Sequence, residues 1–489
     1  MNATFREMSC LILLAPLSLQ AQQGDTLLIP NREPNEMVRI ITGDTLTNGK
    51  RADLKRVYVL LRGERYVTSL PLINEGYKLR IVGQPAPQTG IDPGPPVLQH
   101  SPDSTGHYDT DRLFVVRGDF ELQNVWILAW VSTGAQLWEP ILVEQDSARL
   151  SVDHCIFEWC QGPAIHAASK WTTVHLTNDL FRNANYTNEW WAGRVIYYTA
   201  PADTLVEVNN TVENVGFGLL QSQGIGLNYY LCDHNTVVNC AKFCWLESYY
   251  TEAYIANNLL INCHFTGERQ QDRPRQDPDL LLYGQALSAD TLVVDGKTIA
   301  ASDPRESGRV LIYANNAVYF DTSSFYPFYR SYNDTVTSTE GKILPEPVMN
   351  SRTASMFTWH TGMKDTGSIE GVNPLVTRMP QNVTEIVRFL RDRYSVHPRN
   401  NILWGYDPDS LNDPIAHVSG RELTLVYNNS SRGTYPIPED LSYASKRIYS
   451  GAIGGFAIGD LNWFPDELKK WNLDNDVTHL KMLAPQGGD

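Results

Sequence analysis

The sequence predicts an all-β fold, a parallel β-solenoid followed by a small C-terminal region with short helices. Three observations predict it. A short segment with Asn at fixed positions recurs along the middle of the chain, and alternating apolar and polar residues precede most copies. The composition is also 10% aromatic but only 19% charged. Alternation is typical of strands with one buried face, and aromatic residues favour strands over helices.

The repeat is clearest when the second position of the segment is compared from copy to copy. It falls at Asn124, Cys155, Asp179, Asn210, Asn235, Asn258 and Asn316. The steps fit a unit of about 23 to 25 residues with insertions, one of them the polar stretch 267–280. A unit of this length holds three short strands, so we expect one solenoid coil per unit, with coils stacked about 4.8 Å apart.

Within each unit the alternating residues are expected to face the core. These pairs are Leu150/Val152, Val174/Leu176, Val206/Val208 and Tyr230/Cys232. A second Asn column follows at Asn183, Asn214, Asn239 and Asn262. Asn tolerates left-handed turns and can bond amide to amide along a stack, so both columns are predicted to be structural. His154 and His234 sit in the Asn column, and a structural role is expected for them too.

Six cysteines follow the N-terminal segment, all between Cys155 and Cys263. Cys160, Cys240 and Cys263 share one repeat position, which predicts a stacked column of small buried side chains. Side chains that point the same way one coil apart are poorly aimed for a disulfide. Disulfides and a metal site stay open as alternatives, because an exported chain can oxidise its thiols.

This pattern resembles the right-handed parallel β-helix of the pectin-lyase-like family over about residues 55 to 375. The opening segments Val57–Leu72 and Tyr77–Gln84 are similar to the first coils of secreted bacterial β-helices. Asp440–Pro465 resembles the tail of such proteins in the Bacteroidota and related phyla, which are mostly of unassigned function. The resemblance implies the right-handed sense, which also agrees with the general crossover preference.

Four regions are expected along the chain. Residues 1–21 resemble a secretory signal peptide, with Arg6 before the apolar stretch Leu11–Leu19 and a small residue at Ala21. We therefore expect a protein of the outer cell surface, the extracellular space or the periplasm. Residues 22–55 form a lead-in and cap, 56–375 the β-helix, and 376–489 a region that packs on it. Two helices are expected in the last region, at 381–395 and from Pro465.

The charge excludes several kinds of partner. The chain has 40 Lys and Arg against 55 Asp and Glu, a net charge of -15. A nucleic-acid partner would need a basic stripe, and anionic lipid would also favour basic residues. No apolar run after the signal segment is long enough for a transmembrane span. The expected partner is a polysaccharide or surface glycan, with self-association as a further option.

A short signal for O-glycosylation recurs along the chain. Asp followed by Ser or Thr and then a small aliphatic residue or Thr is similar to the signal that Bacteroidota use on exported proteins. The hydroxyl residues expected to carry glycan are Thr26, Thr45, Ser147, Thr204, Thr291, Thr335 and Ser410. The alternative is that each Asp simply forms a turn before a strand.

The best candidate binding surface is a group of aromatic residues in the middle coils. Exposed rings on a flat ladder of strands suit the C–H faces of sugars. The residues expected to bind glycan are Trp190, Trp191, Tyr197, Trp245, Tyr249 and His166. The alternative is that these rings only stabilise the core.

Catalysis is the alternative to binding alone. The resemblance implies polysaccharide cleavage, but the sequence contains neither the calcium-binding acidic set of pectate lyases nor the Gly-His-Gly and Arg-X-Lys of polygalacturonases. Candidate bases for lyase chemistry are Lys170, Arg194 and Lys242. Candidate carboxylates for hydrolysis are Glu247 and Glu252. Asp407, Asp409 and Asp413 could hold Ca²⁺, the only cofactor suggested, although an acidic turn without metal is the simpler interpretation.

These observations favour an exported β-helix protein that binds polysaccharide or contributes to an extracellular assembly without catalysis. A polysaccharide lyase or glycoside hydrolase of an unassigned β-helix family is the alternative. A purely structural subunit that joins copies of itself is the third hypothesis.

Overall fold

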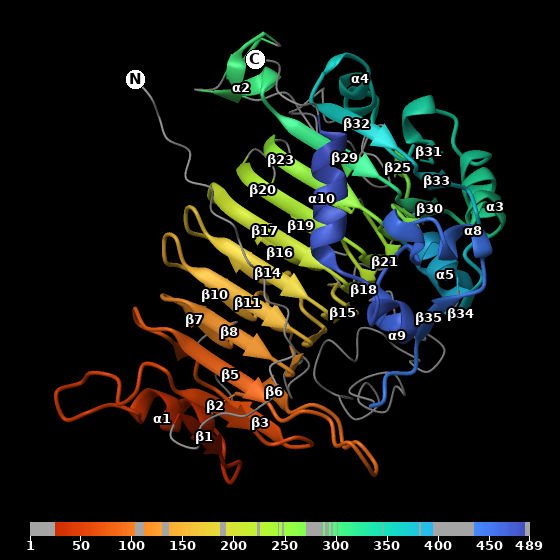
Figure 1. Ribbon diagram of the computed structural model, residues 1–489. Helices are drawn as coiled ribbons and strands as arrows, with labels where there is room; N and C mark the ends of the chain where they lie inside the picture. Colours follow the sequence, from red (N-terminus) through yellow and green to blue (C-terminus); the bar gives the residue numbers. More distant parts are fainter. Residues whose placement is uncertain are drawn as a thin grey trace, which may run out of the picture.

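The computed structural model describes residues 25–102, 112–129, 136–185, 192–222, 225–242, 244–246, 249–269, 287–288, 293–294, 297–300, 302–345, 347–380, 383–394 and 435–484. Within these residues the chain forms three long parallel sheets of 11, 10 and 8 strands. Successive coils stack on one another along the solenoid (Figure 1). The predicted right-handed parallel β-helix is therefore confirmed.

Most coils contribute one strand to each sheet in a fixed order, whereas coils at the two ends contribute to fewer sheets. The 11-stranded sheet consists of β1 (Thr26–Ile29), β2 (Val57–Leu60), β5 (Leu79–Gly83), β8 (Phe120–Gln123), β11 (Arg149–Asp153), β14 (Thr173–Thr177), β17 (Ala202–Val208), β20 (Gly226–Asp233), β23 (Tyr249–Ala256), β29 (Val310–Ala314) and β32 (Met363–Thr366). The 10-stranded sheet consists of β3 (Arg65–Thr68), β6 (Val97–His100), β9 (Trp126–Leu128), β12 (Ile156–Glu158), β15 (Leu180–Arg182), β18 (Thr211–Val215), β21 (Thr236–Cys240), β24 (Leu259–Cys263), β30 (Ala317–Tyr319) and β33 (Ile369–Glu370).

The 8-stranded sheet closes the coil. It consists of β4 (Leu72–Ile73), β7 (Phe114–Val116), β10 (Ile141–Val143), β13 (Pro163–Ala167), β16 (Arg194–Tyr198), β19 (Gly218–Gln221), β22 (Trp245–Leu246) and β26 (Leu287–Ser288). Three short antiparallel pairs lie outside these sheets: β25 (Glu268–Arg269) with β31 (Ile343–Leu344), β27 (Val293–Val294) with β28 (Lys297–Thr298), and β34 (Val376–Arg378) with β35 (Asp440–Tyr443).

The described helices are short and lie at the ends and along one side. They are α1 (Glu36–Gly43), α2 (Pro304–Ser307), α3 (Thr322–Asn333), α4 (Ser351–Trp359), α5 (Val383–Arg393), α8 (Lys446–Tyr449), α9 (Pro465–Leu468) and α10 (Leu473–Leu483). None of the described helices is long and apolar enough to cross a membrane.

The turn from the 11-stranded to the 10-stranded sheet takes a single left-handed residue. The residues with positive φ at this turn are Asn124, His154, Asn178, Asn209, His234, Asn257 and Asn315. The next position points inward and forms an amide ladder, in which Asn210 Nδ2 donates to Asn235 Oδ1 at 2.9 Å and Asn235 Nδ2 to Asn258 Oδ1 at 3.0 Å. Asn258 Nδ2 donates onward to Asn316 Oδ1 at 2.9 Å.

The second Asn column forms a similar ladder at the next turn. Asn183, Asn214, Asn239 and Asn262 all have positive φ. Asn214 donates to Asn183 and Asn262 donates to Asn239, both at 3.2 Å. Because a buried polar group needs a partner, each amide satisfies its neighbour across the coils. The structural role predicted for both columns is confirmed. The predicted place of Asn124 in the first column is wrong, because the register aligns it with the left-handed His154 and aligns Val125 with Cys155.

The predicted core face holds in most coils but not in β17. Leu150, Val152, Val174 and Leu176 lie in the core as predicted. In β17, Leu205 pairs with the core residue Val174 and Glu207 pairs with Leu176. Leu205 and Glu207 are therefore the residues of β17 that face inward. Val206 and Val208 are instead packed on the outer face. Their predicted orientation is wrong because α10 covers that outer face, which makes both faces of β17 apolar and hides the alternation.

The cysteine column is also confirmed. The six described cysteines are all buried and remain thiols. Cys240 stacks on Cys263 in the register between β21 and β24, and Cys160 lies in the same core cluster. Burial raises the pKa of Cys160, Cys240 and Cys244, which keeps them protonated.

The C-terminal region covers one side of the solenoid. The predicted helix at 381–395 is α5, which packs Ile386, Leu390 and Tyr394 against α3 and the nearby coil. The predicted helix from Pro465 is α9. The helix α10, which was not predicted, crosses the outer face of the 11-stranded sheet over β17, β20, β23 and β29 (Figure 1).

Candidate functional site

The outer face of the 8-stranded sheet carries a row of polar and aromatic side chains. In the register of this sheet, Leu142 pairs with His166, His166 with Tyr197, and Tyr197 with Gln221. The neighbouring positions, such as Ile165 and Ile196, pack in the core. Because side chains alternate along a strand, the row of His166, Tyr197 and Gln221 lies on the opposite face, where each is partly exposed.

His166 is held on both sides of its ring. Its Nδ1 lies 2.5 Å from Glu139 Oε2, and its Nε2 lies 3.0 Å from Thr199 Oγ1. A carboxylate only accepts, so Glu139 favours the tautomer with a proton on Nδ1. This leaves Nε2 facing Thr199, which is exposed on the next coil.

Glu139 is the buried anchor of this group. It is 3% exposed and also accepts from Arg112, whose Nε lies 2.8 Å from Oε1. Burial favours the neutral acid, but the bonds from His166 and Arg112 outweigh it and lower the pKa of Glu139. The carboxylate therefore stays charged and can orient the imidazole.

Tyr197 completes the surface. Its ring stacks on His166 with centroids 5.3 Å apart and planes 22° apart. The guanidinium of Arg194 lies 5.3 Å from the Tyr197 ring, and Arg194 Nε donates to the Ala192 carbonyl at 2.7 Å. We call His166, Tyr197, Gln221, Glu139 and Thr199 the outer-face cluster. Its stacked rings and polar edges can contact a sugar through both C–H faces and hydroxyl groups.

The other predicted glycan-binding residues are not part of this cluster. Trp245 is fully buried, and its Nε1 donates to Tyr230 at 2.8 Å, so the expectation of an exposed indole is wrong at this position. Its position in the sheet pairs with Leu220, which faces the core. Tyr249 begins β23 in a different sheet and is partly exposed there. Trp190 and Trp191 lie outside the described residues.

The predicted catalytic residues are spread over different parts of the solenoid. Lys170 is exposed just before β14, and Lys242 follows β21. Arg194 is 4% exposed and engaged with aromatic rings. Glu252 lies on β23 and accepts from Tyr254 at 2.9 Å. Glu247 lies outside the described residues, so the carboxylate pair is not tested.

The remaining predicted sites are placed only in part. Thr45, Ser147 and Thr335 are exposed, whereas Thr204 is partly buried and the hydroxyl of Thr26 is buried. Thr291, Ser410 and the calcium candidates Asp407, Asp409 and Asp413 lie outside the described residues. Exposure is necessary for glycosylation, so three of the sites remain suitable acceptors.

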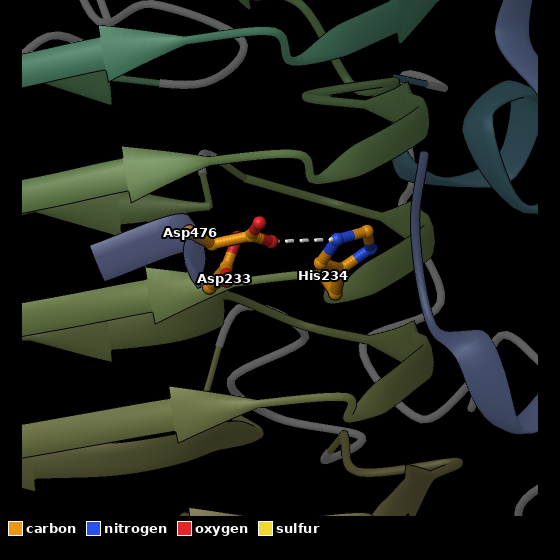
Figure 2. Close-up of side chains that lie close together, drawn as sticks. All are labelled: Asp233, His234 and Asp476. Carbon is orange, nitrogen blue, oxygen red and sulfur yellow. Dashed lines mark ion pairs between the residues drawn. The ribbon is translucent and has the colours of Figure 1, made fainter. Parts of the chain in front are cut away.

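A second cluster lies where α10 meets the turn after β20. Asp233, His234 and Asp476 bring one ligand atom each within 4.8 Å of one another, and all three are buried. Figure 2 shows Asp476 reaching from the helix toward the imidazole of His234, an ion pair of 3.3 Å. We call this the tail cluster. Its burial excludes a large substrate, so it is a different kind of site from the outer-face cluster.

Two features of these candidate sites could not be predicted from the sequence. Glu139 and Arg112 precede their strands in segments without a repeat pattern, so no spacing pointed to them. The predicted turn position of His234 is correct, but the contact of His234 with Asp476 joins residues far apart in the chain. Only the fold brings these groups together.

Known proteins add no family to this description. No family model matches the chain, and no curated protein matches it either.

Proposed function

We propose that this protein is an exported β-helix that binds a polysaccharide or surface glycan on the outer face of its 8-stranded sheet. The observation that carries the proposal is the stacked pair His166 and Tyr197, oriented by the buried Glu139 on a flat parallel ladder. Export is supported by the signal-like residues 1–21 alone.

The chemistry of the cluster fits a neutral or weakly charged glycan. Ring stacking needs no ligand charge, while Gln221 and the exposed Thr199 offer hydrogen bonds to hydroxyl groups. The chain as a whole carries a net charge of -15, which disfavours a polyanion by long-range repulsion.

The test is a panel of neutral and acidic polysaccharides, with binding measured by affinity electrophoresis and calorimetry. Tyr197→Ala and His166→Ala should each weaken binding of the best ligand roughly tenfold, the loss expected for one stacking contact of about 1.4 kcal/mol. Tyr449→Ala is the matched control, because Tyr449 is 40% exposed on α8, away from the cluster. Equal affinity in all four proteins would refute the proposal.

Catalysis at the same cluster is the second candidate. The Glu139–His166 pair is an oriented carboxylate and imidazole, which can act as a general base in lyase chemistry. Formation of unsaturated products, followed by ultraviolet absorbance, would support this activity if His166→Ala abolishes it. Binding without turnover on every polysaccharide of the panel would leave the non-catalytic function.

A further inference from the structure

The tail cluster has donors that suit a metal ion. Asp233, His234 and Asp476 supply two carboxylates and one imidazole, all 0 to 1% exposed. Imidazole with carboxylate is a common ligand set for divalent transition metals. Ca²⁺ prefers six or more oxygen ligands, and Mg²⁺ keeps several waters, so neither suits a buried set with a nitrogen.

The hydrogen bonds around the cluster orient these donors. His234 Nδ1 lies 3.1 Å from the carbonyl of Gly459, which can only accept, so this bond places the proton on Nδ1. The Nε2 lone pair then points toward Asp476, as expected for a metal-binding imidazole. Asp476 Oδ2 accepts from Trp471 Nε1 at 2.8 Å, and Asp233 Oδ1 accepts from Asn257 Nδ2 at 2.8 Å. These outer contacts fix both carboxylates.

Two atoms of the cluster have no hydrogen-bond partner among the described residues. They are His234 Nε2 and Asp233 Oδ2, and both are buried. The contact from Nε2 to Asp476 is an ion pair at 3.3 Å without hydrogen-bond geometry. A buried polar atom without a hydrogen-bond partner is unfavourable, and a bound ion would supply the missing partner.

Charge balance points the same way. With a neutral imidazole, the two carboxylates place two buried negative charges side by side, which is costly without a counter-ion. A divalent cation at this position would neutralise both carboxylates.

We propose that Asp233, His234 and Asp476 bind one divalent transition-metal ion that fastens α10 to the middle coils of the solenoid. Asp233 is the last residue of β20, His234 forms the turn after it, and Asp476 lies in the first turns of α10. The ion links segments more than two hundred residues apart in the chain. Its role is structural, because the site is closed to substrates.

The test uses the full chain without a histidine tag. Metal content is measured by mass spectrometry after purification without chelator. The chelated protein is then titrated with Zn²⁺, and with Co²⁺ as a spectroscopic probe. The expected result is about one equivalent bound per chain, visible absorption typical of a Co²⁺–imidazole site, and a higher Tm with metal than with chelator.

Three variants make the test specific. Asp476→Asn and His234→Asn should remove tight binding and the rise in Tm. Asn is the natural residue at the same turn in neighbouring coils, so His234→Asn keeps the left-handed turn. His154→Asn is the matched control, since His154 has the same φ but is far more exposed and is paired with Asp153.

Two outcomes would overturn the proposal. One is a wild-type chain that is metal-free as purified and whose Tm does not change with Zn²⁺, Co²⁺ or Mn²⁺, which would assign the cluster to protons alone. The other is His234→Asn that binds metal as tightly as the wild type. Circular dichroism of each variant separates lost binding from lost folding.

Discussion

At the scale of single residues, Asn235 shows what the inner ladder does. Its Nδ2 donates to Asn258 Oδ1 and to the backbone carbonyl of Glu207, and its Oδ1 accepts from the backbone N–H of Asn210. The side chain therefore satisfies backbone groups that the sharp turn between two sheets leaves without a strand partner. The same residue type does this in four coils, at Asn210, Asn235, Asn258 and Asn316.

Asn235→Ala should destabilise the protein by about 3 kcal/mol, because it removes several buried hydrogen bonds and leaves their partners unsatisfied. The free energy of unfolding from urea titration measures this. Asn228→Ala is the control, since Asn228 is exposed and should change stability by less than about 0.5 kcal/mol. Similar losses in both variants would mean that the ladder does not stabilise the turn.

Glu207 is a charged residue type inside the solenoid. It is fully buried and accepts from the Tyr230 hydroxyl at 2.5 Å. Burial raises its pKa from 4.5 to about 7, although the Tyr230 bond lowers it in part. Between these two pH values the folded chain binds more protons than the unfolded chain. Its contribution to the free energy of unfolding therefore falls as the pH rises through that window.

Glu207→Gln should remove this pH dependence. At pH 8 the variant is expected to be more stable than the wild type by about 3 kcal/mol, since one pKa unit is worth about 1.4 kcal/mol. Below about pH 4 the two should be nearly equal, because the acid is then neutral in both states. Urea titrations across this range measure the difference, with exposed Glu75→Gln as control. A pH-independent difference would contradict the buried-acid explanation.

The residue scale also shows the limit of prediction from sequence. The Asn columns could be predicted because residues one repeat apart lie above one another in any solenoid. The inward direction of Glu207 and Trp245 could not, because a shift of one residue reverses every side chain of a strand. Aromatic residues on both faces gave no pattern from which to choose the register.

At the scale of elements, α10 explains why the outer face of the 11-stranded sheet is apolar. Leu473 and Leu480 of the helix pack with Val206, Leu231 and Ile312 of three strands. Without the helix these strands would expose a continuous apolar patch, a typical aggregation surface. The helix is therefore a cover for the middle coils.

Leu480→Ala should cost about 3 kcal/mol, because the fully buried side chain leaves a cavity between helix and sheet. Thermal and urea unfolding measure the loss. Met482→Ala, two residues away and 65% exposed, should change stability by less than about 0.5 kcal/mol. If the two variants behaved alike, α10 would not be packed on the sheet in solution.

The two long C-terminal helices differ in how far they could be predicted. The apolar positions of α5 repeat at helical spacing over the whole segment, so its core face was visible in the sequence. The core contacts of α10 lie on strands far away in the chain, and only the fold shows that these strands have an apolar outer face. The outer-face cluster could not be predicted either, because Glu139 and Arg112 lie near His166 only when the coils are stacked.

At the scale of the whole molecule, the segment 451–463 contacts several successive coils, including coils that are not direct neighbours. The carbonyl of Gly451 accepts a hydrogen bond from Asn315 Nδ2. The backbone N–H groups of Ile453 and Gly459 both donate to Asn257. Leu461 donates to Asn209 Oδ1 at 3.3 Å. In an ordinary solenoid each coil stabilises only its neighbours. Here the tail couples several coils into one unit.

Gly459→Ala tests this coupling. Gly459 has φ +97°, and a Cβ there would lie 2.5 Å from Thr236 Oγ1 and 2.9 Å from Leu259 Cβ, so the tail must lift from the coils. Gly455→Ala is the matched control, because Gly455 has φ +82° but no atom within 4 Å of the added Cβ. Both variants carry the backbone strain of about 1 kcal/mol, whereas only the first carries the clash.

Hydrogen exchange followed by mass spectrometry measures the result. In Gly459→Ala, amides of the tail and of the turns from Asn178 to Asn315 should exchange faster together, because the tail bonds to those turns. The coils around β2 and β5 lie outside that stretch and should keep the wild-type rate. Gly455→Ala should show only a small, local increase. Faster exchange confined to the tail, with unchanged turns, would mean that the coils hold together without it.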